Sequence, residues 1–217
     1  MLPATPSWIV VIPIKSPQIA KSRLEGTPRA ASTAEFAGAF ARDVVAVAKR
    51  VSEVDRVVVV TSDGGLAKEV ESLGARVLSE PTRLTGDLNA VLKFAQGEEL
   101  SNYPNCPIAI VTADLATIQP AALASLLDNA SRTERGFVAD HTGLGTSLLI
   151  NRSGRAVTTA FGPASANAHR TRGFDDLTEF AQDSLRLDVD TPDDLERAIV
   201  VGLGPAASRL VTYPRPT

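Results

Sequence analysis

Four short apolar runs alternate with helix-length segments in the first half of the chain, and this alternation constrains the fold more than any other feature. Each run is rich in β-branched residues and almost continuously apolar, which is typical of strands buried on both faces. Strands joined through helices by short connections form βαβ units, whose strands run parallel. The pattern therefore predicts an α/β protein with three layers, in which a mostly parallel central sheet lies between helices. The predicted strands are Trp8–Ile14, Val54–Val60, Ala75–Leu78 and Pro107–Thr112, and the predicted helices are Ser32–Arg50, Gly64–Leu73, Asp87–Leu100 and Gln119–Ala130.

The second half of the chain is less regular, but it ends in a clear helix signal. Thr191 suits a helix N-cap, Pro192 suits the first helical position, and Asp194 completes a capping box. We expect the tail from Gly202 to Thr217, which holds three prolines, to be frayed or loosely packed. The further predicted elements are strands at Gly136–Asp140, Thr146–Asn151 and Ser184–Val189 and a helix at Thr191–Val201.

Composition narrows the class of protein. The 217 residues contain 44% hydrophobic and 22% charged residues, which predicts one globular domain over residues 1–217. A formal net charge of −3 gives no basic footprint for nucleic acid. No apolar run reaches the roughly 18 residues of a membrane span or resembles a signal peptide, so we expect a cytoplasmic protein. With one cysteine and two histidines, any metal is expected to be a hard ion such as Mg²⁺ on oxygen ligands.

Charged side chains follow several of the predicted strands, at the edge where ligands bind in open α/β sheets. Cations at one strand end and carboxylates at two others suit an anionic, metal-bound substrate such as a nucleoside triphosphate. Neither G-x-G-x-x-G nor G-x-x-x-x-G-K-[ST] follows the first strand, which disfavours a dinucleotide dehydrogenase and a P-loop NTPase. The residues concerned are Lys15, Lys21 and Arg23 after the first strand, Asp114 after the fourth, and Asp188 and Asp190 on the last.

Each of these residues also has a plain structural interpretation. The three cations could form a solvated basic loop, Asp114 and Asp190 could support helix N-termini, and Asp188 could face solvent. If 165–170 is helical, Ser165 and His169 are four apart and share a face, and the start of that helix offers free N–H groups to a phosphate. An ordinary polar helix is the alternative there. His141 lies in a turn and is expected to be exposed.

Taken together, the segments resemble the CofC/FbiD guanylyltransferases of coenzyme F-420 biosynthesis. The resemblance runs from about Ile9 to Gly204 in the same order, nearly the whole chain. Short pieces such as A-D-L occur in other nucleotidyltransferases, whereas the combination is specific. The motifs are K-S-R-L at Lys21–Leu24, Leu88-Asn89, A-D-L at Ala113–Leu115, G-x-G-T at Gly143–Thr146, F-G-P-x-S-x-x-x-H at Phe161–His169 and D-V-D-T-P at Asp188–Pro192.

This resemblance implies a GT-A-like nucleotidyltransferase fold and transfer of GMP from GTP to the phosphate of a three-carbon phosphoacid, with release of pyrophosphate. Phosphoenolpyruvate is the expected acceptor, and 2-phospho-L-lactate and 3-phosphoglycerate are the alternatives used by other members. Two Mg²⁺ ions and a downstream deazaflavin transferase are also implied. The implied roles are metal binding by Asp114, Asp188 and Asp190 and acceptor binding by Thr146, Gly162 and Ser165. The mechanism that we expect from this makes Lys15, Lys21, Arg23 and Asp114 the catalytic residues: the three cations hold the triphosphate and stabilise charge on the departing pyrophosphate. Asn89 is expected to bind the nucleotide as well, and His169 is expected to bind or position the acceptor.

The chain departs from the family pattern in three places. The usual A-D-L-P reads A-D-L-A, with Ala116 last; Arg29–Ala34 lacks the usual Glu-Arg; and the Gly-Leu-Asn element is one residue longer at Gly86–Asn89. Two other classes stay open from the residues alone. One is another nucleotidyltransferase or sugar transferase of the same fold, although these usually begin with a Gly-rich loop that this chain lacks. The other is a nucleotide-binding module without turnover.

Overall fold

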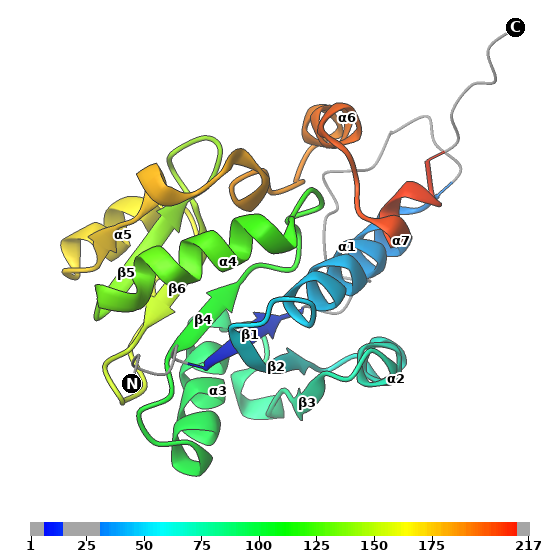
Figure 1. The fold of residues 1–217 in the computed structure, drawn as a ribbon. Helices are drawn as coiled ribbons and strands as arrows, with labels where there is room; N and C mark the ends of the chain where they lie inside the picture. The colour runs from blue at the N-terminus through cyan, green and yellow to red at the C-terminus, as the bar shows by residue number, and fades with distance from the viewer. Residues whose placement is uncertain (1–6, 15–30, 212–217) are drawn as a thin grey trace, which may run out of the picture.

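The computed structural model describes residues 7–14 and 31–211, which form a seven-stranded sheet covered by helices (Figure 1). The strand order is β3-β2-β1-β4-β6-β5-β7. The pairs β4–β6 and β5–β6 are antiparallel and the other four are parallel, which confirms a mostly parallel sheet. In chain order the main elements are β1 (Trp8–Pro13), α1 (Thr33–Ala48), β2 (Val54–Thr61), α2 (Gly64–Ser72), β3 (Arg76–Ser79), α3 (Leu88–Asn102), β4 (Ile108–Val111), α4 (Pro120–Asn129), β5 (Arg135–Ala139), β6 (Thr146–Asn151), α5 (Ser165–Thr171), β7 (Asp175–Asp176), α6 (Pro192–Val201) and α7 (Pro205–Ser208).

The central strands are buried on both faces, as their continuous apolar sequence predicts. Trp8, Val10 and Ile12 of β1 pack in one core cluster, whereas Ile9 and Val11 pack in the other. Successive side chains of a strand point to opposite faces, so each face of the sheet needs its own helical cover.

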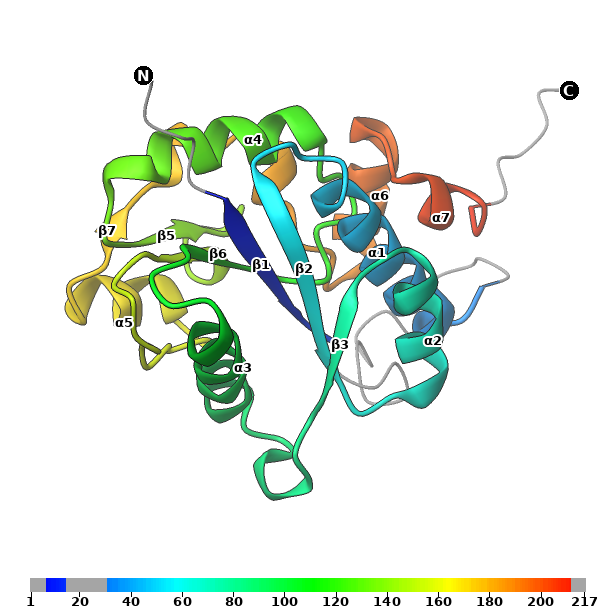
Figure 2. The same ribbon diagram turned by 60° about the horizontal axis from the view of Figure 1, so that its bottom comes forward.

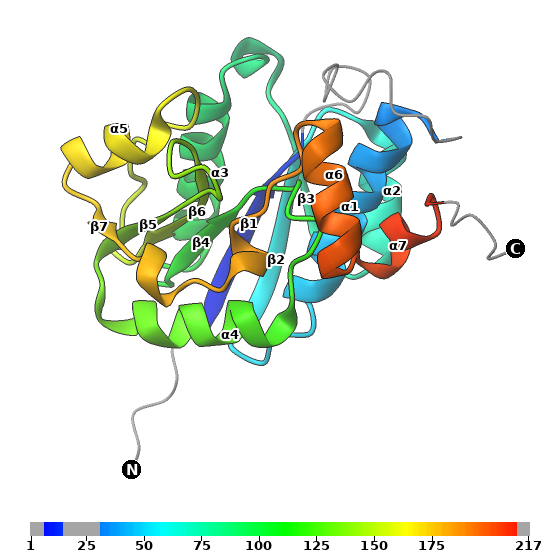
Figure 3. The same ribbon diagram turned by 90° about the horizontal axis from the view of Figure 1, so that it is seen from above.

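That cover comes from two sets of helices, which makes the three predicted layers. Side chains of α1, α2 and α4 belong to one cluster, and side chains of α3 and α5 belong to the other. Figure 2 and Figure 3 show α4 and α3 on opposite sides of the sheet. A third cluster joins the outer side of α1 to α6 and α7 through Phe36, Phe40, Leu195 and Ala207.

Local capping signals set the starts of several helices. Ser32 accepts a hydrogen bond from the Glu35 N–H, and the Glu35 carboxylate accepts from the Ser32 N–H, which closes a capping box at α1. Thr191 and Asp194 form the same device at α6, which confirms the predicted start of that helix.

The strand predicted at Ser184–Val189 is absent from the described residues. A short 3-10 turn occupies Asp183–Leu185, and the segment then runs on without joining the sheet as a strand. Leu185, Leu187 and Val189 are all buried, so the alternation that predicted a strand is real. These side chains fill two core clusters instead of pairing with a neighbouring strand.

The tail is better packed than its prolines predict. Residues Pro205–Ser208 form α7, and Ala207 and Val211 are buried beside α1. The buried Asp43 of α1 accepts hydrogen bonds from the N–H groups of Ala206 and Ala207 at 2.8 and 2.9 Å. The part of the tail beyond 211 lies outside the described residues.

The structure also bears on membrane association. Within 7–14 and 31–211, no helix is both long and apolar enough to cross a membrane.

Candidate active site

The loop that follows β4 carries the first predicted metal ligand, Asp114. Its backbone carbonyl accepts hydrogen bonds from the N–H of Ala116 at 2.9 Å and from the N–H of Val189 at 3.1 Å. The first bond closes a tight turn that a proline at position 116 could not close, because proline has no N–H. The second bond joins this loop to the Asp188–Asp190 segment, so two motifs far apart in the sequence meet beyond the end of β4.

Asp188 is the carboxylate of this region whose pKa is shifted most from its usual value. Burial and then the negative charge of Asp114 raise its pKa to about 6, and a hydrogen bond from His141 opposes this rise. The charges of Asp140 and Asp190 add smaller upward shifts to the pKa. Carboxylate oxygens are the ligands that a hard divalent cation prefers, so the residue types of this region suit such an ion.

The three-residue metal site itself stays a prediction. Among residues 7–14 and 31–211, no three His, Cys, Asp or Glu side chains stand close enough to hold a metal ion by themselves. Asp188 is half-buried and Asp190 is exposed.

His141 was expected to be exposed, and the structure places it between two carboxylates instead. Its Nδ1 lies 3.1 Å from Asp188 Oδ1, and its Nε2 lies 3.3 Å from Asp194 Oδ1. The other oxygen of Asp194 serves the capping box of α6. The imidazole therefore ties the position of Asp188 to the start of a helix. No local sequence pattern signals this, because the partners come from different segments.

The β5–β6 loop, residues 140–145, is folded around the carboxylate of Asp140. Oδ1 accepts from the Thr142 N–H, the Thr142 hydroxyl and the Leu144 N–H, and Oδ2 accepts from the Gly145 N–H at 2.8 Å. A Cβ on Gly145 would collide with the same carboxylate. The second glycine of the G-x-G-T motif therefore allows the backbone to approach Asp140. Asp140 is a further site residue that the sequence analysis did not single out.

The predicted acceptor residues lie at the same edge of the sheet. Because β6 runs antiparallel to β4, its first residue, Thr146, lies beside the carboxyl end of β4. Ser165 and His169 are both buried on α5, which confirms that this segment is helical and that they share a face. The Ala166 N–H donates to the Leu144 carbonyl at 3.1 Å, which seats the start of α5 against the β5–β6 loop.

Gly162 stands in the turn that leads into α5. Its φ of +136° is a conformation that favours glycine. The turn is closed by the Ser165 N–H, which donates to the Gly162 carbonyl at 3.1 Å. Gly162 itself is exposed.

Asn89 was expected to bind nucleotide, and its side chain holds the 159–161 segment. Its Nδ2 donates to the Phe161 carbonyl at 2.9 Å, and its Oδ1 accepts from the Phe161 N–H at 2.8 Å and from the Thr159 hydroxyl at 2.6 Å. The amide thus joins the start of α3 to the chain just before Gly162. Lys15, Lys21 and Arg23 lie outside the described residues.

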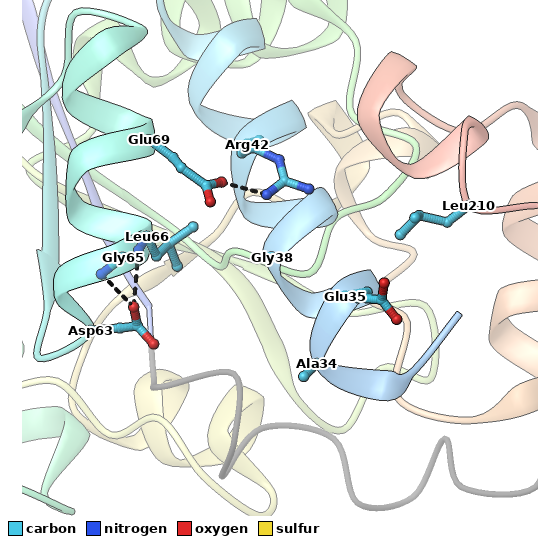
Figure 4. A pocket seen from close by; sticks show the side chains of 9 residues that line it. All are labelled: Ala34, Glu35, Gly38, Arg42, Asp63, Gly65, Leu66, Glu69 and Leu210. Atoms are coloured by element: carbon cyan, nitrogen blue, oxygen red, sulfur yellow. Dashed lines mark hydrogen bonds and ion pairs between the residues drawn. The ribbon is translucent and has the colours of Figure 1, made fainter. Parts of the chain in front are cut away.

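A separate cavity of about 310 Å³ lies between α1 and α2 (Figure 4). Arg42 and Glu69 form an ion pair at 2.5 Å across it, and Asp63 caps α2 by accepting from the N–H groups of Gly65 and Leu66. None of the predicted site residues within the described ranges lines this cavity.

Comparison with known proteins gives a consistent result. The sequence model of the family described as "Guanylyl transferase CofC like" matches residues 8–212. The chain is 42% identical over 210 residues to the phosphoenolpyruvate guanylyltransferase of Streptomyces scabiei (strain 87.22), covering 94% of this chain and 97% of the relative. It is 37% identical over 209 residues to the protein of the same name from Mycobacterium ulcerans, covering 95% and 94%.

Solved structures share the fold at lower identity. A 4-diphosphocytidyl-2C-methyl-D-erythritol synthase superposes with a TM-score of 0.62 at 17% identity, covering 90% of this chain and 99% of that one. A Mycobacterium tuberculosis protein, determined as a complex with manganese, gives a TM-score of 0.54 at 22% identity and covers 89% and 97%. The observed fold is therefore the nucleotidyltransferase fold that the sequence predicts.

Proposed function

Because the chain belongs to the CofC-like guanylyl transferase family, we propose that it transfers the guanylyl group of GTP to phosphoenolpyruvate and releases pyrophosphate. Curated relatives at 36–42% identity over nearly the whole chain carry the name phosphoenolpyruvate guanylyltransferase. The observation that supports the proposal most is the hydrogen bond from the Val189 N–H to the Asp114 carbonyl. It draws the two carboxylate motifs together at the sheet edge that also carries Thr146.

The acceptor is proposed to bind at Thr146, Gly162 and Ser165. Thr146 begins β6, Ser165 begins α5, and Gly162 lies in the turn before α5. The Ala166–Leu144 hydrogen bond joins α5 to the β5–β6 loop. Hydroxyl and backbone N–H groups are donors that suit a phosphoacid, whose polar atoms are all oxygens that accept hydrogen bonds.

A divalent cation is proposed at Asp114, Asp188 and Asp190. When bound, it would neutralise phosphate charge and stabilise charge that develops on the departing pyrophosphate. The raised pKa of Asp188 supports the proposal, because a crowded and partly buried carboxylate gains most from a neighbouring cation. His141 is proposed to orient the Asp188 carboxylate through the 3.1 Å contact between its Nδ1 and Asp188 Oδ1. Mg²⁺ is the proposed ion. Two such ions are proposed, because both substrates carry phosphate charge that must be neutralised.

The nucleotide is proposed to be held by Lys15, Lys21 and Arg23. Two unit charges of the same sign at about 4 Å repel by roughly 4 kcal/mol at an effective dielectric constant near 20, so several cations are needed to bring two polyanions together. An oxygen of the acceptor phosphate would attack the α-phosphorus of GTP and form a new P–O bond. The bond to pyrophosphate breaks, and the pyrophosphate oxygen takes the electron pair. No proton transfer is needed, because the attacking phosphate is already ionised.

The proposal extends to the setting of the reaction. A cytoplasmic location suits an enzyme whose two substrates are dissolved phosphorylated metabolites. The product is proposed to pass to a deazaflavin transferase, as the resemblance implies.

The direct test is pyrophosphate release from GTP and Mg²⁺ with phosphoenolpyruvate, 2-phospho-L-lactate or 3-phosphoglycerate as acceptor. The downstream transferase and its deazaflavin acceptor should be present to trap a labile product, and ATP and CTP serve as nucleotide controls. Turnover with GTP and phosphoenolpyruvate that stops with EDTA and returns with Mg²⁺ is expected. Folded protein that is silent with all three acceptors would overturn the proposal.

A further inference from the structure

His169 is a buried polar side chain whose two ring nitrogens both contact the chain. The residue is 0% exposed and lies among the rings of Phe137, Phe161 and Phe174, at centroid distances of 6.0, 5.3 and 5.3 Å. Its Nδ1 is 3.0 Å from the Thr146 hydroxyl oxygen, and its Nε2 is 2.9 Å from the backbone nitrogen of Ala160. A buried imidazole between three aromatic rings thus connects β6 to the segment before Gly162.

These contacts fix which ring nitrogen carries the hydrogen. A backbone N–H can only donate, so Nε2 must present its lone pair to Ala160. Burial and then the charge of Arg172 lower the pKa of His169 to about 4, and a hydrogen bond with the Ser165 backbone opposes this fall, so the ring is neutral near pH 7. The single hydrogen of the neutral ring therefore lies on Nδ1, where it is donated to the Thr146 oxygen.

The donated hydrogen determines how the Thr146 hydroxyl can act. The oxygen accepts from the ring, so its own hydrogen must point away from the ring. A hydroxyl held in this way is a donor to whatever lies on its other side. The phosphate and carboxylate oxygens of a phosphoacid can only accept, so this orientation is the one that binds them.

The second ring nitrogen supports the other half of the acceptor site. Ala160 is anchored by His169, and Phe161 is anchored through both its N–H and its carbonyl by Asn89. The chain therefore reaches Gly162 with its preceding backbone held from α5 on one side and α3 on the other. Side chains that fix a binding group in advance spare the ligand the cost of ordering it.

We propose that His169 is a positioning residue of the acceptor site, which holds the Thr146 hydroxyl as a donor through Nδ1–H and anchors the segment leading to Gly162 through Nε2. The proposal rests on the proposed function, in which Thr146 and Gly162 bind the phosphoacid. His169 takes no part in proton transfer, because both its nitrogens are engaged within the protein.

Two substitutions separate the two contacts. The side-chain amide of His169→Asn occupies the place of Nδ1 and can still donate to Thr146, whereas the amide of His169→Gln reaches the place of Nε2 and can accept from Ala160 only. We expect His169→Gln to raise the KM for phosphoenolpyruvate about tenfold, with the KM for GTP within about twofold of wild type. His169→Asn is expected to retain more of the acceptor affinity than His169→Gln.

The link through Thr146 is tested by a double-mutant cycle. Thr146→Val removes the hydroxyl with little change of shape and should raise the KM for phosphoenolpyruvate by itself. Adding His169→Gln to Thr146→Val should then cost much less than it does in the wild-type background. Fully additive effects, or equal increases in the KM of both substrates, would overturn the positioning role.

A spectroscopic measurement keeps the inference testable where a variant does not fold. In ¹⁵N-histidine-labelled, substrate-free protein, His169 should show a protonated Nδ1 and an unprotonated Nε2 down to about pH 5. The chain has two histidines, so a His141→Gln variant assigns the signals. A ring protonated on Nε2, or one that titrates near pH 6.5, would refute the inference. Wild-type protein inactive with phosphoenolpyruvate but with the expected tautomer would instead count against the proposed function.

Discussion

Replacing Asp140 by Asn tests whether one carboxylate folds the β5–β6 loop. Oδ1 of Asp140 accepts three hydrogen bonds and Oδ2 accepts one from the Gly145 N–H at 2.8 Å, and the residue is 8% exposed. An Asn that keeps the three bonds must turn its NH₂ group toward the Gly145 N–H, so that two donors face each other. An Asn in the opposite orientation loses the other three bonds.

The best available arrangement therefore loses one charge-assisted hydrogen bond and leaves an N–H without its acceptor. This costs about 1–3 kcal/mol of unfolding free energy. For a chain of this length, a loss of about 2 kcal/mol lowers Tm by roughly 4–8 °C. Removing the charge of Asp140 also relieves Asp188, but that repulsion is a smaller cause of the raised pKa of Asp188 than burial or Asp114.

Urea unfolding followed by circular dichroism measures the loss, and an unchanged m-value shows that the two-state comparison holds. Asp128→Asn is the matched control, because Asp128 lies exposed on α4. We expect Asp128→Asn to stay within about 0.5 kcal/mol of wild type. Asp140→Asn in the same range would refute the argument that the carboxylate holds the loop.

Three further predictions follow from other parts of the structure. Gly204→Ala should lower the unfolding free energy by about 1–3 kcal/mol, because its Cβ would lie 2.5 Å from Asp43 Oδ2. Gly97→Ala within α3 should raise the unfolding free energy by about 0.5–1 kcal/mol, because nothing lies within 4 Å of its Cβ. Urea unfolding compares the two variants, and changes of the same sign in both would contradict the packing described at Gly204. Asp188→Asn should cut cation-dependent turnover more than tenfold. It should also raise the Tm of the cation-free protein, because burial and the charge of Asp114 disfavour the ionised Asp188 carboxylate. A lower Tm would contradict this repulsion between Asp188 and Asp114. The pKa of His169 is about 4 in the folded protein and near 6.5 in the unfolded chain, so between these pH values the unfolded chain binds more protons. The unfolding free energy should therefore be unaffected by this ring above pH 6.5 and fall by up to about 3 kcal/mol as the pH drops toward 4. His169→Gln should lack this slope in urea unfolding measured across that range, and a parallel pH dependence would show that the ring is not the cause.

Much of the fold could be predicted because local rules decide it. The apolar runs became β1 to β4 within a residue or two, and the Thr191–Asp194 capping box starts α6 where the sequence placed it. The Ser165–His169 spacing also gave one shared helix face, as expected. These features depend on residues a few positions apart, whose geometry is the same in any protein.

The segment 184–189 shows where such rules stop. Leu185, Leu187 and Val189 alternate with more exposed residues as in a strand, but a strand also needs a partner with free backbone groups. Here β7 pairs with β5, and the 184–189 segment packs its side chains into the core without joining the sheet. Burial alone thus produces the pattern, and the sequence cannot distinguish the two cases.

By itself the sequence determined the layers, the order of the main elements, the family and the end of the strand after which Asp114 stands. Only the tertiary structure decided which atoms the site residues meet. His141 contacts Asp188 across 47 positions of sequence, Asn89 holds Phe161 across 72, and His169 holds Thr146 across 23. The physical reason is that strands and helices follow from short-range periodicity, whereas hydrogen bonds between distant segments depend on how the packed layers bring those segments together.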